Sequence, residues 1–133
     1  MSTLDVCSLD LYSGECHFIK VGSSSSYIKR QHLVDRISSG NLPLGIFQKP
    51  DVESIGRTLM DGDYIIMMSD GVLDALPFYD KEKRMKEIID GIEERMPQAI
   101  AERILNEVYY YDEKVADDMT VLVTGIWKIR NGE

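Results

Sequence analysis

The stretch DGDYIIMMSDGVLDA, residues 61–75, decides the fold, because the period of the apolar residues changes within it. Residues 64–68 form a continuous apolar run, which is typical of a central strand buried on both faces. Asp70 follows this strand almost directly, and a short helix is predicted to begin at Val72. We therefore expect an acidic side chain at the end of a buried strand, where it is held rigidly and still reaches solvent.

The sequence before this stretch predicts strands. Two of them, 4–12 and 15–21, flank Ser13-Gly14, which suits a short hairpin connection. Apolar residues on both faces of this pair predict that it is covered on both sides, as inside a layered domain. The remaining predicted strands are 27–30, 32–37, 52–59 and 63–69, with turns at 22–26, 38–43 and 61–62.

The sequence after this stretch predicts two longer helices and a last strand. Apolar residues recur at helical spacing in two groups, and Pro97 suits the first turn of the second helix. Residues 119–129 are rich in β-branched side chains and predict a strand. The fold class is therefore α+β, with antiparallel sheets and packed helices in one domain over residues 1–133. The helical groups are Met85, Ile88, Ile89 and Ile92, then Ile100, Ile104 and Val108.

Composition excludes several classes of function. The net charge of -8 argues against a nucleic-acid-binding surface, which requires clustered Lys and Arg. The chain has no run of about 18 apolar residues and no secretion signal, so no membrane contact by this segment is expected. Leu11 rather than Cys7 is predicted to lie opposite Cys16, so we expect two free thiols, which fit a cytoplasmic location. A membrane anchor elsewhere in a longer parent protein is compatible with this expectation.

Two acidic segments carry the candidate chemistry. Asp70 follows one predicted strand, and Asp117 and Asp118 precede another. Carboxylates gathered at strand ends suit hard divalent cations such as Mg²⁺ or Mn²⁺. For each segment a structural alternative stays open: Asp70 could cap the short helix, and Asp117-Asp118 could form a turn.

The two segments resemble late motifs of the metal-dependent (type 2C, or PPM) protein phosphatase family. More narrowly, the chain resembles the phosphatase domain of stage II sporulation protein E over nearly its whole length. The resemblance implies an α-β-β-α sandwich, of which this chain is the C-terminal portion. The stretches that carry the resemblance are STLDVCSLDLYSGECHFIKVGSSSSYIKR (2–30), SSGNLPLGIF (38–47), DGDYIIMMSDGVLDA (61–75) and ADDMTVLV (116–123).

The resemblance also implies an activity, hydrolysis of phosphoserine or phosphothreonine on proteins by water that two Mn²⁺ or Mg²⁺ ions activate. Carried over by position, Asp70 and Asp117 are metal ligands and Asp118 supports the site. Gly71 allows a sharp turn beside the ion, whereas Asp74 is expected on a solvated helix face. The narrower resemblance implies a phosphoserine substrate of the anti-anti-sigma factor kind, dephosphorylated during sporulation.

The family pattern includes an earlier Asp-Gly metal-binding element that follows the first strand of the domain. No such pair precedes Leu4, and neither Asp61-Gly62 nor Asp90-Gly91 can replace it by position. We therefore expect at most one weak metal site in this chain, no activity of the chain alone, and self-association through exposed sheet edges. The alternatives are a non-catalytic protein-interaction module on a phosphatase fold and an unrelated α+β binding domain.

Overall fold

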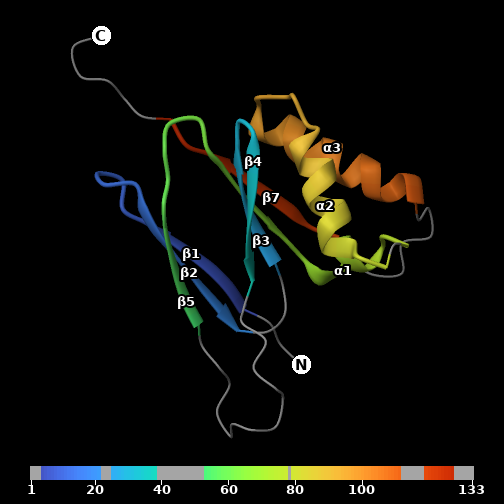
Figure 1. The fold of residues 1–133 in the computed structure, drawn as a ribbon, viewed down its shortest axis with the longest axis horizontal. Helices are drawn as coiled ribbons and strands as arrows, with labels where there is room; N and C mark the ends of the chain where they lie inside the picture. The colour runs from blue at the N-terminus through green and yellow to red at the C-terminus, as the bar shows by residue number, and fades with distance from the viewer. Residues whose placement is uncertain (1–3, 22–24, 39–52, 78, 112–118, 128–133) are drawn as a thin grey trace, which may run out of the picture.

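Two antiparallel sheets and three helices form the described part of the chain, which confirms the predicted α+β class (Figure 1). The computed structural model describes residues 4–21, 25–38, 53–77, 79–111 and 119–127 of the 133. One sheet contains, in spatial order, β1 (Leu4–Leu9), β2 (Glu15–Val21) and β5 (Glu53–Thr58). The other contains β4 (Leu33–Ser38), β3 (Ser25–Arg30), β6 (Tyr64–Met68) and β7 (Val121–Gly125).

The helices all lie on one side of the four-stranded sheet, so the layers run sheet, sheet, helices (Figure 1). They are α1 (Asp70–Asp74), α2 (Lys81–Asp90) and α3 (Pro97–Tyr111). Pro97 is the first residue of α3, as its fixed φ and missing N–H predict. No helix among these residues is long and apolar enough to span a bilayer.

The central strand β6 is buried on both faces, as its unbroken apolar sequence predicts. Ile65 belongs to the core between the two sheets, together with Phe18 of β2. Ile66 belongs to the second core, where the sheet packs against Ile89 and Ile104 of the helices. Because successive side chains of a strand point to opposite faces, β6 takes part in both cores.

The first hairpin differs from the prediction. The strands end at Leu9 and resume at Glu15, so the connection spans five residues rather than the two of Ser13-Gly14. The carboxylate of Asp10 accepts hydrogen bonds from the backbone N–H groups of Tyr12 (2.8 Å) and Ser13 (3.3 Å), which turns the chain before residue 11. Leu9, not Leu11, therefore lies opposite Cys16.

The boundaries of other strands also differ from the prediction. β3 begins at Ser25, inside the stretch predicted as a turn, and within the described residues β7 is shorter than the predicted 119–129. The predicted loop 38–43 lies outside the described residues except for Ser38, the last residue of β4. The outward side chain of Val6 is 41% exposed, so the expected cover on both faces of the first hairpin is not met by the described elements.

Candidate metal site at the end of the central strand

Asp70 is the first residue of α1 and lies directly beyond the end of β6. Ser69 holds the N-cap position in an extended conformation, so the alternative that Asp70 caps this helix is wrong. The carboxylate of Asp70 is partly buried and has no hydrogen bond or ion pair with another described residue. With respect to the described residues, its oxygen atoms are therefore available for a ligand.

Ser69 connects the end of β6 to the start of β7. Its backbone N–H donates to the carbonyl oxygen of Thr120 (3.0 Å), and its Oγ accepts a hydrogen bond from the Thr120 N–H (2.9 Å). Met68 and Val121 continue the same pairing as register partners in the sheet. The backbone beside Asp70 and the start of β7 therefore meet at one end of the four-stranded sheet.

Asp117 and Asp118 themselves lie outside the described residues, so their roles stay predictions. Thr120 follows Asp118 by two positions in the chain and is bonded to the residue before Asp70. This connection is what the metal-ligand prediction requires of the described part of the chain.

Two further predicted positions can be placed. Gly71 lies in the first turn of α1, just after the chain passes from β6 into the helix, and does not have a positive φ. Its supporting role beside an ion stays a prediction. Asp74 is on the exposed side of the helix, with 70% of its side chain accessible and Lys81 Nζ at 3.9 Å. The prediction of a solvated face for Asp74 is confirmed.

The oxygen chemistry of Asp70 fits Mn²⁺ or Mg²⁺, both of which bind carboxylates. The described residues contain no group of three or more His, Cys, Asp or Glu side chains arranged to hold a metal ion. Of the predicted ligands, only Asp70 falls in this part of the structure.

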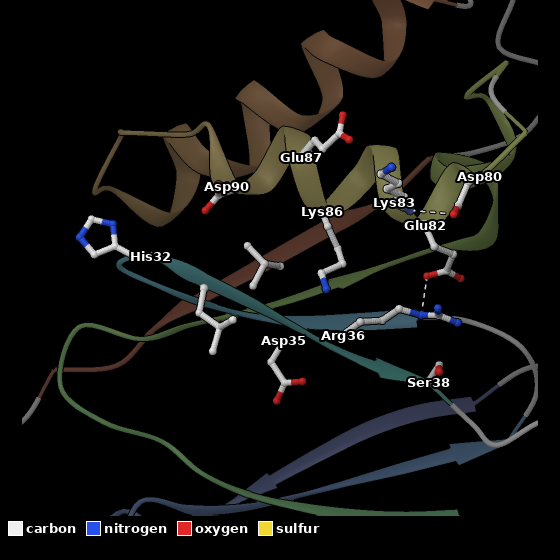
Figure 2. A pocket seen from close by; sticks show the side chains of 12 residues that line it. His32, Asp35, Arg36, Ser38, Asp80, Glu82, Lys83, Lys86, Glu87 and Asp90 are labelled. Carbon is white, nitrogen blue, oxygen red and sulfur yellow. Dashed lines mark hydrogen bonds and ion pairs between the residues drawn. The ribbon is translucent and has the colours of Figure 1, made fainter.

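A groove of about 700 Å³ lies between the edge strand β4 and helix α2 (Figure 2). This groove was not predicted, because its two walls come from elements that are separated by more than 40 residues in the chain. Glu82 of α2 closes one side and binds Arg36 Nε of β4 (2.6 Å). Its carboxylate also accepts hydrogen bonds from Ser25 Oγ (2.9 Å) and Tyr27 OH (3.2 Å). Burial, together with Glu82, raises the pKa of Tyr27, which keeps this hydroxyl a donor.

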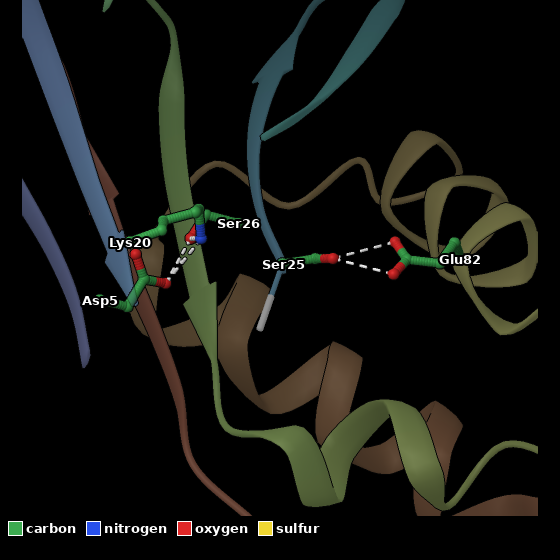
Figure 3. A network of polar contacts seen from close by, with 5 residues as sticks. All are labelled: Asp5, Lys20, Ser25, Ser26 and Glu82. Carbon is green, nitrogen blue, oxygen red and sulfur yellow. Dashed lines mark hydrogen bonds and ion pairs between the residues drawn. The ribbon is translucent and has the colours of Figure 1, made fainter. Parts of the chain in front are cut away.

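A second polar network joins the two sheets at the end where β6 leads to Asp70 (Figure 3). Lys20 Nζ donates to Asp5 Oδ2 (3.0 Å) and to Ser26 Oγ (2.9 Å), and Ser26 Oγ donates to Asp5 Oδ2 (2.7 Å). Lys20 is fully buried, whereas Asp5 Oδ1 is buried without a hydrogen-bond partner in the described structure. Strand periodicity could have revealed this network, because it places Lys20 on the same face as the apolar Phe18.

Both cysteines are free thiols, as predicted, and Cys7 does not lie opposite Cys16, although the residue opposite Cys16 is Leu9 rather than Leu11. Cys7 pairs with Phe18, which places it diagonally across from Cys16 on the same face of the hairpin. Burial raises the pKa of Cys7 to about 11, and the neighbouring Cys16 thiol contributes to this shift.

Comparison with known proteins agrees with this architecture. The family model "Stage II sporulation protein E (SpoIIE)" matches residues 1–126. The chain is 39% identical over 127 residues to stage II sporulation protein E of Bacillus subtilis (strain 168), which covers 94% of this chain and 15% of that protein. It is 38% identical over 124 residues to the protein of the same name in Priestia megaterium, covering 92% of the chain and 21% of the relative.

Solved structures show the same fold. The phosphatase domain of the cell fate determinant SpoIIE from Bacillus subtilis (Mn presoaked) superposes with a TM-score of 0.87 at 35% identity, over 97% of this chain and 58% of that one. The catalytic domain of the serine/threonine phosphatase PstP in complex with 2 manganese ions superposes with a TM-score of 0.68 at 16% identity, over 95% of this chain and 59% of that one. The latter likeness concerns the fold alone.

The fold and the sequence match define the class of protein, a serine phosphatase domain of the type 2C kind, of which this chain corresponds to a part. The chain belongs to the stage II sporulation protein E family. It spans about one-fifth or less of the full relatives and about three-fifths of the solved phosphatase domain.

Proposed function

We propose that this chain is the C-terminal portion of a Mn²⁺- or Mg²⁺-dependent protein serine/threonine phosphatase domain and supplies two of its metal ligands, Asp70 and Asp117. The observation that carries the proposal is the pairing of Ser69 with Thr120 beside Asp70, whose carboxylate has no partner among the described residues. That pairing holds the backbone beside Asp70 against Thr120, three residues after Asp117 in the chain, which supports a site shared by the two acids.

Each residue of the proposed metal centre has a separate role. When bound, divalent ions lower the pKa of a water molecule and neutralise phosphate charge. Asp70 and Asp117 hold the ions through carboxylate oxygens, while Asp118 supports the site and Ser69 orients the backbone that carries Asp70. Burial of β6 on both faces keeps this backbone rigid.

A complete centre requires an additional carboxylate, which we assign to an Asp-Gly element in the remainder of the domain. The chain alone is then inactive and binds at most one ion weakly. We further propose that the substrate is a phosphoserine protein of the anti-anti-sigma factor kind and acts in sporulation, because the relatives are named sporulation proteins. A cytoplasmic location, with an anchor elsewhere in a longer protein, fits this substrate.

Mn²⁺-dependent hydrolysis of a phosphoserine peptide tests the proposal in the longer protein that carries this chain. Asp70→Ala and Asp117→Ala should each reduce the rate at least about a hundredfold, since each removes a charged ligand from the centre. Asp74→Ala is the matched control, because Asp74 is an acid on the same short helix and faces solvent. Unchanged hydrolysis after both ligand substitutions would contradict the proposed roles.

A non-catalytic interaction module is the other reading. It predicts that the longer protein binds its phosphoprotein partner without releasing phosphate at any Mn²⁺ concentration. The same assay therefore separates the two functions, and the presence of Mn²⁺-dependent turnover excludes the module.

A further inference from the structure

β4 is an edge strand that lies beside the groove. It is the terminal strand of the four-stranded sheet, paired on one side with β3 and on the other with no described strand. Half of the backbone N–H and C=O groups of such a strand point away from its partner and stay available. The groove runs along this edge between β4 and α2 (Figure 2).

The acidic and basic side chains that line the groove differ in whether they have a partner within the protein. Most of its acids are occupied within the protein: Glu82 by Arg36, Asp35 by Arg57 (2.8 Å) and Glu87 by Arg84 (3.3 Å). The carboxylate of Asp80 caps α2 by accepting from the Lys83 N–H (3.0 Å).

Lys83 and Lys86, in contrast, line the groove with exposed ammonium groups and have no described side-chain partner. Lys86 extends from α2 toward the strands (Figure 2). Asp80 lies at the end of the groove near Arg36, and Asp90 lies with His32 at the other end, so the two unengaged positive charges are in the middle of the α2 wall.

The direction of the groove relates it to the proposed metal site. Ser38 at the end of β4 is the register partner of Ser25, and Ser26 is the partner of Met67, close to the end of β6. The groove therefore runs along β4 toward the end of the sheet where Asp70 lies. A polypeptide following it would be led to that end.

We propose that the edge of β4 and the lysines of α2 form a docking site for an extended acidic segment of the phosphoprotein substrate, which adds to the sheet as a further strand. The inference rests on the proposed function for the identity of the partner. Main-chain hydrogen bonds to β4 supply affinity, and acidic side chains at alternate positions face Lys83 and Lys86 and supply selectivity.

The first experiment measures binding alone, by fluorescence anisotropy, in the longer protein. The probe is a labelled ten-residue peptide of alternating Thr and Glu without phosphate, and a Thr–Lys peptide is its control. We expect the Thr–Glu peptide to bind, and Lys83→Gln/Lys86→Gln to weaken it about five- to tenfold, as expected for two partly screened charges. Arg95→Gln, which removes an exposed charge beyond the end of α2, should leave binding unchanged. Equal binding of both peptides would overturn the proposal.

Backbone pairing is tested in the peptide, without a protein variant that could fail to fold. N-methylation at alternate residues removes every amide donor on one edge of the added strand. Methylation of one set of alternate residues should abolish binding, and methylation of the other set should leave the affinity within about twofold, because only one edge of the added strand faces β4. Equal losses of affinity for the two methylated peptides would overturn strand addition. Competition between the peptide and dimerisation of the protein would also overturn the proposal.

The two proposals fail in different ways. Hydrolysis of p-nitrophenyl phosphate, which has no peptide backbone to pair with β4, reports the phosphatase alone, and its absence would contradict the proposed function. If that hydrolysis is present and the lysine variant does not raise KM for a phosphoserine peptide extended by Thr–Glu repeats, the docking site is wrong. An increased KM with unchanged kcat is the result expected.

Discussion

Lys20 is fully buried between the two sheets, and its ammonium group lies between a carboxylate and a hydroxyl. The ion pair with Asp5 is compact, at 3.0 Å, and only 14% of the Asp5 side chain is accessible. Removing one member of a buried pair leaves the other charge without compensation, which costs far more than the net contribution of the intact pair.

Lys20→Met should therefore lower the free energy of unfolding by about 3 kcal/mol, measured by urea denaturation. The double variant Lys20→Met/Asp5→Leu removes both charges and should recover a substantial part of this loss. If the single and double variants are equally destabilised, the charge left on Asp5 is not the cause.

The thiol of Cys7 gives a prediction about pH. Its pKa of about 11 means that at pH 8 roughly one thiol in a thousand is the reactive thiolate. Because burial raises this pKa, the neutral form is favoured in the fold, and reactivity appears only as the pH rises.

Alkylation of Cys7 by iodoacetamide, followed by mass spectrometry, should be slow at pH 8 and increase about tenfold per pH unit up to pH 10. Ser8→Cys provides the comparison, since residue 8 is exposed on the opposite face of β1. Its introduced thiol should react faster and level off nearer pH 9. Similar rates for the two thiols at pH 8 would show that Cys7 is not protected.

At the scale of elements, α2 depends on its N-terminus. Asp80 Oδ1 accepts a hydrogen bond from the Lys83 N–H, and Glu82 in the first turn ties the helix to β3 and β4. Both acids lie where the helix dipole favours negative charge. The helix is thereby positioned over the sheet at its N-terminal end.

Asp80→Ala should lower the free energy of unfolding by about 1 kcal/mol through loss of the cap. Asp90→Ala is the matched control at the other end of the same helix, where a negative charge is unfavourable, and it should be neutral or slightly stabilising. Urea denaturation of the two variants compares them, and equal losses would argue against a capping role.

The sequence predicted the elements better than their ends. The spacing of the apolar residues located β6, α2 and α3, because burial of a defined face requires apolar residues at regular positions in the sequence. The first hairpin was misjudged because Ser13-Gly14 looks like a turn, whereas the Asp10 carboxylate closes the loop earlier. A side chain that bonds to the backbone in this way leaves only a weak signal in the sequence.

The candidate site was predictable for a similar reason. Asp70 stands beside glycine at the end of an apolar run, and both features are local in the chain. The groove and the Lys20 network, by comparison, arise from contacts between residues far apart in sequence, such as Ser25 with Glu82. Pair contacts of this kind require the packing of whole layers, which residue periodicity does not specify.

At the scale of the whole molecule, both sheets end in strands that have only one described neighbour, namely β1, β5, β4 and β7. Unpaired strand edges readily pair with other chains. The chain alone should therefore self-associate at high concentration, and light scattering of the purified chain measures it. A monomeric mass at crystallisation-like concentrations would contradict this prediction.

The central claim is that Asp70 and Asp117 belong to a two-metal centre that this chain completes but does not form alone. Titration of Mn²⁺ by calorimetry into the longer protein tests it most directly. The account predicts two bound ions for that protein, fewer after Asp70→Asn or Asp117→Asn, two after Asp74→Asn, and at most one weakly bound ion for this chain alone. Two tightly bound ions in the Asp70→Asn or Asp117→Asn protein would contradict it.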